Sequence, residues 1–192
     1  MSEDAWRLFC AIETSEELRQ QVSKHIRRLR EKHNHIRASW VTEFNLHLTI
    51  KFIGNVPLQN VDILTSAAAR AVNELRKFNI ASAGTGVFPR SNSPRVLWIG
   101  INDPSGELAQ LYARLEKECV TAGFQPEDRS FKPHLTLARV REPNQARALA
   151  LDHVQSTFKP IELPVSELLV VRSQMSNKGS TYTVISRHPL IP

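Results

Sequence analysis

The sequence predicts an α+β fold with two lobes, in which two pseudo-symmetric antiparallel β-sheets face a central cleft and carry helices on their outer faces. Two observations support this prediction. The pattern His-Leu-Thr-aliphatic occurs twice, at 47–50 and 134–137, and the two histidines lie 87 residues apart, close to half of the chain. Around both copies the expected elements follow a similar order of strands and helices. Because no linker separates the halves, we expect a single bilobal domain over residues 1–192.

Composition excludes several classes of protein. The 192 residues are 41% hydrophobic and 23% charged, which is typical of a globular protein. No apolar run is long enough to cross a membrane, and the N-terminus lacks the apolar segment of a secretory signal. The two cysteines, Cys10 and Cys119, form neither a CxxC motif nor a disulfide framework. We therefore expect a cytoplasmic protein and, since no oligomer interface is recognisable, a monomer.

The first part of the chain predicts a strand and a long amphipathic helix. Residues 6–13 are rich in aromatic and apolar side chains, as in a strand. Thr14 or Ser15 can cap a helix whose first turn carries two glutamates. The apolar stripe of this helix recurs at helical spacing over about four turns and consists of Leu18, Val22, Ile26 and Leu29. Residues 33–45 are polar and are expected to be irregular.

The middle of the chain predicts the first motif strand and the elements that follow it. This strand is expected over 46–53, with Gly54 ending it and Pro57 opening a second helix. Residues 78–87 are expected to be extended, and 95–101 have the apolar character of a buried strand. A loop rich in Pro and Ser joins these two segments.

The last part of the chain predicts a third helix and the second motif strand. Pro104 and Ser105 open the helix and Gly123 ends it, and the motif strand covers 134–140. A short helix is expected at 143–152. Two strands are expected at 161–172 and 181–188, and a turn at 176–180 joins them.

The two motifs bring together groups that suit acid–base chemistry. In a strand, residues two apart point to one face, so each His lies beside a Thr hydroxyl while the aliphatic residues face the core. Histidine titrates near neutrality, so one ring can accept a proton while the other donates one. Hydroxyl groups can donate hydrogen bonds to an anionic oxygen. This set fits in-line displacement at phosphorus and requires no metal or cofactor.

Other interpretations of the histidines are weaker. Zinc usually needs three or four protein ligands, and neither motif supplies a neighbouring Cys, Asp or third His. His33 and His35 lie in a polar segment and are not expected to bind metal. His25 is expected on the surface of the basic helix, and His153 and His188 are expected to be structural or exposed to solvent.

With these motifs the chain resembles the 2H phosphoesterase superfamily, and in particular the RNA 2′,3′-cyclic phosphodiesterases, historically called 2′-5′ RNA ligases. The resemblance extends over nearly the whole chain. The stretches that carry it are 7–12, 45–54, 94–100, 131–139 and 171–182. It implies a bilobal fold in which the two motifs face each other across a cleft.

The resemblance also implies an activity and a site. The activity is metal-independent opening of a terminal 2′,3′-cyclic phosphate on RNA or an oligonucleotide, which leaves a 2′-phosphate and a free 3′-OH. His47 and Thr49 would form one half of the site, and His134 and Thr136 the other. Our hypothesis is that His134 activates the water and His47 protonates the leaving oxygen, although the symmetry of the motifs leaves the two roles interchangeable. The reverse reaction would be 2′-5′ ligation.

Position five after each histidine distinguishes the halves. Arg139 matches a family arginine that contacts phosphate, but strict alternation from His134 would point it to the opposite face. Its role therefore requires a β-bulge or the end of the strand at this place. Phe52 occupies the equivalent position in the first half, where a core aromatic is expected over base stacking. Phe9 and Tyr182 present the same choice.

The formal net charge of +6 favours an anionic partner, and RNA is the partner we expect. Much of the excess lies in one helix and could form either a solvated face or a surface that attracts RNA: Lys24, Arg27, Arg28, Arg30 and Lys32. Two other functions stay open. One is a non-catalytic protein that binds RNA ends, and the other is a related enzyme that acts on a small cyclic nucleotide.

Overall fold

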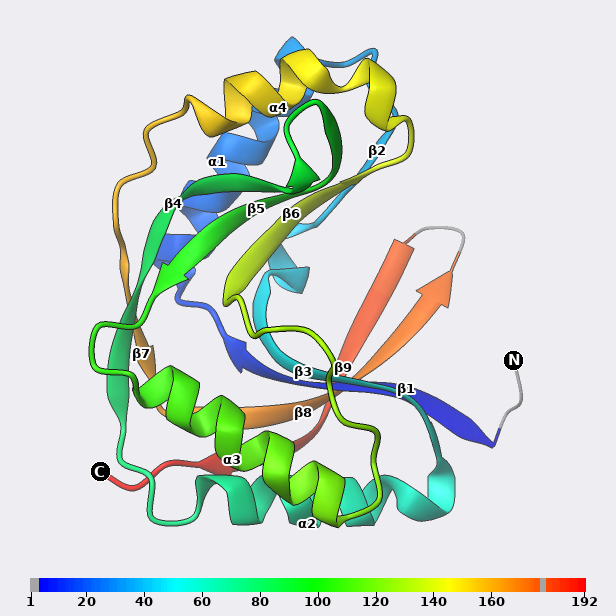
Figure 1. Ribbon diagram of the computed structural model, residues 1–192, viewed down its shortest axis with the longest axis vertical. Coiled ribbons are helices and arrows are strands. Elements are labelled where there is room, and N and C mark those ends of the chain that lie inside the picture. The colour runs from blue at the N-terminus through cyan, green and yellow to red at the C-terminus, as the bar shows by residue number, and fades with distance from the viewer. Residues whose placement is uncertain (1–3, 177–178) are drawn as a thin grey trace.

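The computed structural model describes residues 4–176 and 179–192, and its strands form two antiparallel sheets (Figure 1). Sheet A has the strand order β3-β1-β8-β9, and sheet B has the order β2-β6-β5-β4-β7. The elements are β1 Ala5–Glu13, α1 Glu16–Lys32, β2 Ala38–Trp40, β3 His47–Pro57, α2 Val61–Val72, β4 Phe78–Arg90, β5 Ser93–Asn102, α3 Glu107–Thr121, β6 His134–Val140, α4 Arg147–Val154, β7 Glu162–Val165, β8 Glu167–Ser176 and β9 Gly179–Pro189.

The helices cover the two sheets in pairs, as the α+β prediction requires. Helices α2 and α3 pack together beneath sheet A, and α1 and α4 lie against each other over sheet B (Figure 1). Each pair combines one helix from the first half of the chain with one from the second half. The first helix, α1, follows β1 of sheet A yet lies over sheet B. Within the described ranges, no helix is both long and apolar enough to cross a membrane.

A continuous apolar core joins the two sheets and their helices. Both motif strands contribute to it through alternate residues: Leu48 and Ile50 from β3, and Leu135 and Leu137 from β6, each at most 3% exposed. Burial of one such side chain contributes on the order of 2 kcal/mol. The core therefore fixes which face of each motif strand is turned away from it, and this face carries the His and Thr side chains.

Strand β3 continues past the glycine that was expected to end it. Gly54 has a φ of +91°, and the pairing with β1 shifts register there, from Leu8 opposite Gly54 to Phe9 opposite Phe52. A β-bulge thus bends the strand without ending it. The prediction of a strand end was wrong because a glycine that opens a turn and a glycine in a bulge look alike in sequence.

Three predicted boundaries moved by a few residues. Pro57 is the last residue of β3, and a 3₁₀ turn precedes α2. The third helix begins at Glu107 and not at Pro104, because the Asp103 carboxylate accepts hydrogen bonds from the backbone N–H groups of Leu108 and Ala109 at 3.2 and 2.9 Å. The short helix predicted at 143–152 is a 3₁₀ turn followed by α4.

The segment 161–172 was predicted as one strand but forms parts of two. Strand β7 pairs with β4 in sheet B, whereas β8 pairs with β1 in sheet A, and Ser166 lies between them. Local apolar pattern cannot reveal a change of partner sheet. Of the turn predicted at 176–180, Asn177 and Lys178 lie outside the described residues.

Strand β2 was missed because it has only three residues and lies in the segment expected to be irregular. It pairs with β6 at the edge of sheet B, with Ser39 opposite Arg139. A strand this short has no periodic pattern, so it forms only because β6 offers a partner. The loop predicted between the segments 78–87 and 95–101 is also shorter than expected, since β4 runs to Arg90 and β5 starts at Ser93.

Two histidines form a polar link between the helices that cover sheet B, namely His25 of α1 and His153 of α4. His153 is fully buried, and its Nε2–H donates to the carbonyls of Gly86 and Trp98 at 3.1 and 3.0 Å. Its Nδ1 lies 2.9 Å from Nε2 of His25, which corrects the prediction that His25 is a surface residue. Burial lowers the pKa of both rings, that of His25 to about 4.

This histidine pair predicts acid-sensitive stability. The folded protein binds fewer protons here than the unfolded chain, so the free energy of unfolding should fall as pH decreases from about 6.5 toward 4. We expect the melting temperature to drop between pH 7 and pH 5, and to drop less in His25→Gln, which cannot titrate. Equal pH dependence in the two proteins would contradict this assignment.

Candidate active site

A cleft of about 820 Å³ separates the two sheets. Sheet A contributes side chains from all four of its strands, and sheet B contributes side chains from β2 and β6. The polar and aromatic residues most relevant to chemistry are His47, Thr49, Phe52, Arg139, Arg141 and Tyr182. The structure thus brings the first motif and Arg139, which lie far apart in sequence, into one cavity.

Both motif strands carry a β-bulge at the same place. Between β3 and β1, Thr49 pairs with Ala11 and Lys51 with Cys10, so Ile50 is the extra residue. Between β6 and β5, the same shift leaves Leu137 extra. Both strands therefore show the same order of burial, with two consecutive buried residues after the motif threonine.

The bulge has a direct consequence for the residue at position five. It reverses the alternation, so Arg139 returns to the face of β6 that carries His134 and Thr136, and Phe52 returns to the face that carries His47. Of the two features that would allow a site role for Arg139, a β-bulge or a strand end, the structure has the β-bulge.

The second motif is not part of the lining of this cavity. His134 and Thr136 are half-buried and point away from the core, but they are not among the side chains that line the 820 Å³ cleft. Their strand, β6, contacts β3 directly. Neither Thr49 nor Thr136 uses its hydroxyl in a hydrogen bond with another described residue.

Backbone carbonyls hold both histidine rings in the same way. Nδ1 of His47 lies 2.8 Å from the carbonyl of Asn45, and Nδ1 of His134 lies 2.6 Å from the carbonyl of Lys132. Since a carbonyl can only accept, each Nδ1 carries the hydrogen and each Nε2 is left to exchange protons. The side chain of Asn45 in turn donates to the carbonyl of Ser180 at 2.7 Å, which ties this turn to β9.

Aromatic rings surround the two imidazoles. Phe9 stacks on His47 at 4.7 Å between ring centroids, and Tyr182 meets it edge-on at 5.0 Å. Phe88 meets His134 edge-on at 5.1 Å. No carboxylate contact with either ring is found among the described residues, so the rings lack the acidic partner that would stabilise a positive charge.

This environment favours neutral histidines. Burial lowers the pKa of His47 to about 4, although its hydrogen bond to the Asn45 carbonyl acts in the opposite direction. Burial also lowers the pKa of His134; the Lys132 carbonyl opposes this effect and the charge of Arg139 adds to it. A negative charge beside either ring would raise the pKa of that ring.

Phe9 and Phe52, which the sequence left between core packing and base stacking, differ in their exposure. Phe9 is 4% exposed and forms a small cluster with Ala11, Leu169 and Val171 beneath His47, so its role is packing. Phe52 is 46% exposed in the cleft, which corrects the expectation of a core position. The Arg7 guanidinium lies 4.8 Å from the centre of the Phe52 ring.

Sequence reasoning missed several parts of this site. The carbonyls of Asn45 and Lys132 carry no side-chain signal, although both stand two residues before a motif histidine. Arg141 could have been found, because alternation after a bulge puts it on the face of Arg139. Among the described residues, no group of three or more His, Cys, Asp and Glu side chains is arranged to hold a metal ion.

Comparison with known proteins gives this site a family. Residues 14–177 match the family model of the 2′-5′ RNA ligase superfamily. An RNA 2′,3′-cyclic phosphodiesterase of Thermotoga maritima is 34% identical over 180 residues, which cover 93% of this chain and 92% of that protein. One of Methanothermobacter thermautotrophicus is 32% identical, with coverage of 92% and 95%.

Solved structures agree with these relatives. Escherichia coli LigT in complex with 3′-AMP aligns with a TM-score of 0.75 and 28% identity, covering 98% of this chain and 99% of that chain. A protein of Thermus thermophilus gives a TM-score of 0.76 and 26% identity, with 96% and 97% covered. These matches confirm the resemblance and the α+β fold inferred from the motifs. The chain belongs to the 2′-5′ RNA ligase superfamily.

Proposed function

We propose that this protein is an RNA 2′,3′-cyclic phosphodiesterase, which opens the terminal cyclic phosphate of RNA or an oligonucleotide to a 2′-phosphomonoester without a metal ion. The observation that carries the proposal is the matched pair of histidines, each held through Nδ1 by a backbone carbonyl and each left with Nε2 for proton transfer. Relatives from Thermotoga maritima and Methanothermobacter thermautotrophicus that bear this name support the phosphodiesterase class.

In the proposed reaction, a water molecule attacks phosphorus as its proton passes to Nε2 of His134. The bond between phosphorus and the 3′ oxygen breaks, and this oxygen takes the proton from Nε2 of a protonated His47. The products are a 2′-phosphomonoester and a free 3′-OH. His134 ends protonated and His47 neutral, so proton exchange with solvent restores the starting state. Each proton transfer contributes about 10²–10⁴ in rate.

The remaining site residues would bind the phosphate. The hydroxyls of Thr49 and Thr136 are unpaired among the described residues and can donate to its non-bridging oxygens. Arg139 lies in the cleft on the same face as the second motif and would supply the positive charge. A bound monoanion would also raise the pKa of His47, which must be protonated to act as the acid.

The other functions are weaker on chemical grounds. A protein that only binds RNA ends would be better served by arginine or lysine than by two neutral histidines. A small cyclic nucleotide is a second candidate substrate, because Escherichia coli LigT has been solved with a mononucleotide, the non-cyclic 3′-AMP. The same site could also run in reverse as a 2′-5′ ligase, although water favours hydrolysis. We retain a monomer with one bilobal domain as the working description.

The two-histidine proposal predicts that either ring is indispensable. We expect His47→Ala and His134→Ala each to lower kcat on a 12-nucleotide RNA with a 2′,3′-cyclic phosphate at least 100-fold, with EDTA present throughout. His35→Ala, at an exposed histidine outside the cleft, should retain full activity. Full activity of either folded site variant would contradict the mechanism, and a requirement for added metal would contradict its metal-free part.

The assignment of acid and base can be tested with a modified leaving group. A substrate with sulfur in place of the 3′ leaving oxygen needs no proton to depart, so it should restore much of the rate of His47→Ala but not that of His134→Ala. The reverse pattern would exchange the two roles. Analysis of the natural product by chromatography should find a 2′-phosphate, and a product with only 3′-phosphate would refute the regiochemistry.

The lowered pKa values predict where activity falls. Because kcat/KM reports on the free enzyme, its bell-shaped pH profile should peak below pH 6.5, where one of the two rings can be protonated. The alkaline limb of kcat should lie at higher pH, since bound phosphate raises the pKa of the acid. A kcat/KM that rises steadily through pH 7 would be inconsistent with two buried histidines of lowered pKa.

A further inference from the structure

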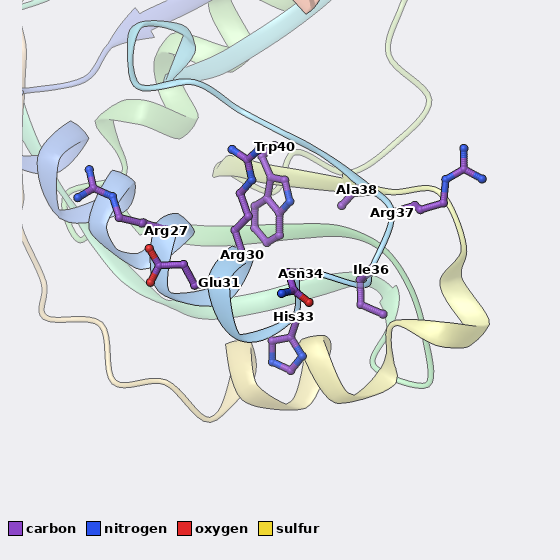
Figure 2. A pocket seen from close by; sticks show the side chains of 9 residues that line it. All are labelled: Arg27, Arg30, Glu31, His33, Asn34, Ile36, Arg37, Ala38 and Trp40. Carbon is purple, nitrogen blue, oxygen red and sulfur yellow. The ribbon is translucent and has the colours of Figure 1, made fainter.

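A second groove lies beside the cleft, between the C-terminal part of α1 and β2. Its volume is about 690 Å³. Its charged and aromatic lining consists of Arg27, Arg30, Glu31, His33, Arg37 and Trp40 (Figure 2). Figure 2 shows Arg30 extending from α1 toward the indole of Trp40. Neither the motifs nor the proposed reaction accounts for this groove.

The structure divides the basic residues of α1 between two tasks. Arg28 and Lys32 lie 2.9 and 3.0 Å from the carboxylate of Asp152 on α4, so they are bound within the fold. Nε2 of the buried His33 lies 2.9 Å from the same carboxylate. Burial alone would raise the pKa of Asp152, but the hydrogen bonds from His33, Arg28 and Lys32 outweigh it and hold this pKa below its usual range.

Arg27 and Arg30 are directed elsewhere. They are exposed, and within the described part of the chain neither forms an ion pair. Glu31 follows Arg27 by four residues and therefore lies on the same face of the helix. Glu31 is the single acidic side chain in the described lining of the groove. Arg37 adds a further charge, 3.2 Å from Glu142. Since Arg37 is paired with Glu142, the positive charge of the groove that forms no ion pair with a described carboxylate is that of Arg27 and Arg30.

Trp40 connects this groove with the cleft. It is half-buried on the edge strand β2 and lines both cavities. On the cleft side, Arg139 pairs with Ser39 across the β2–β6 ladder, and Arg141 donates to the Ser39 hydroxyl at 3.3 Å. Positive charge thus continues from the cleft, across β2 and past an aromatic ring, to Arg30 and Arg27.

We propose that this groove binds the body of a single-stranded RNA whose 3′ end lies in the cleft. The backbone phosphates 5′ of the terminal nucleotide would contact Arg27 and Arg30, and one base would stack on Trp40. Arginines that follow a nucleic-acid backbone beside an aromatic platform are the recurring chemistry of single-strand binding. The inference rests on the proposed function, because a cyclic phosphate at the 3′ end leaves only the 5′ direction for the strand to leave the cleft.

The groove would make the enzyme selective for polynucleotides over mononucleotides. A cyclic mononucleotide would occupy the cleft alone, whereas a longer RNA would gain phosphate contacts and a stacked base. The logarithm of the affinity falls as the logarithm of the salt concentration rises, and each phosphate contact on a single strand makes this slope steeper by about 0.7. Two arginines should therefore account for about 1.4 of that slope.

The test uses Arg27→Glu/Arg30→Glu and a matched control, Lys77→Glu/Lys117→Glu. The control makes the same change in net charge at exposed lysines remote from the groove, one of them on α3 beneath sheet A. Two quantities are measured in both variants. One is the ratio of kcat/KM for a 12-nucleotide RNA cyclic phosphate over that for cytidine 2′,3′-cyclic phosphate. The other is the affinity, by fluorescence anisotropy, for a labelled 12-nucleotide RNA ending in a 2′-phosphate.

We expect the groove variant to lower the selectivity ratio at least tenfold and to reduce the salt slope of RNA binding, while the control changes either quantity less than twofold. A groove variant that behaves like the control would overturn the inference. The anisotropy measurement needs no turnover, so it distinguishes the two failures. If the wild-type protein hydrolyses neither substrate, the proposed function fails, whereas unchanged RNA binding in the groove variant overturns the groove by itself.

Trp40 gives a second, independent measurement. Trp40→Phe keeps an aromatic face and should retain most of the affinity for the labelled RNA, whereas Trp40→Leu keeps apolar volume only and should lose about fivefold or more, since stacking of one base is worth about 1–3 kcal/mol. Equal affinities of the two variants would show that no base stacks at this position.

Discussion

The structure of this protein depends on the burial of the aliphatic residues of two motif strands in one core. Leu48 and Ile50 from sheet A and Leu135 and Leu137 from sheet B are nearly inaccessible, so their strands cannot shift by one residue without exposing them. This constraint turns the His and Thr side chains of both strands away from the core. The matching bulge after each threonine then returns the fifth residue to the same face.

Chemistry at the site follows from what surrounds each ring. A backbone carbonyl fixes the hydrogen on Nδ1, and the aromatic neighbours pack against each ring without adding charge. Such a ring has a lowered pKa, and an anion bound beside it would make it easier to protonate. Binding of the phosphate and readiness to transfer a proton are therefore coupled by electrostatics, with no acidic side chain among the described contacts.

The two halves are similar in backbone and different in charge. Equivalent positions after the bulges hold an exposed aromatic ring in β3, Phe52, and a cation in β6, Arg139. Sheet B has in addition the edge strand β2 with Trp40, and beyond it lie Arg27 and Arg30 of α1, which form no ion pair with any described residue. A pseudo-symmetric scaffold thus holds different side chains at equivalent positions of its two motif strands.

The sequence by itself determined the elements with a strong local pattern: the stripe of α1, both motif strands, the bounds of β6 and the α+β class. It also determined that the His and Thr side chains of each motif lie on one face of their strand, because this alternation is a property of the strand. Tertiary structure decided the rest. The division of 161–172 between two sheets, the three-residue β2 and the continuation of β3 past Gly54 depend on partner strands that local sequence does not specify. The same holds for the histidines and the basic helix. Arg28 is bound to Asp152, whereas Arg27 forms no ion pair with a described residue and lines the groove. This difference depends on which carboxylate the fold brings within reach of each arginine.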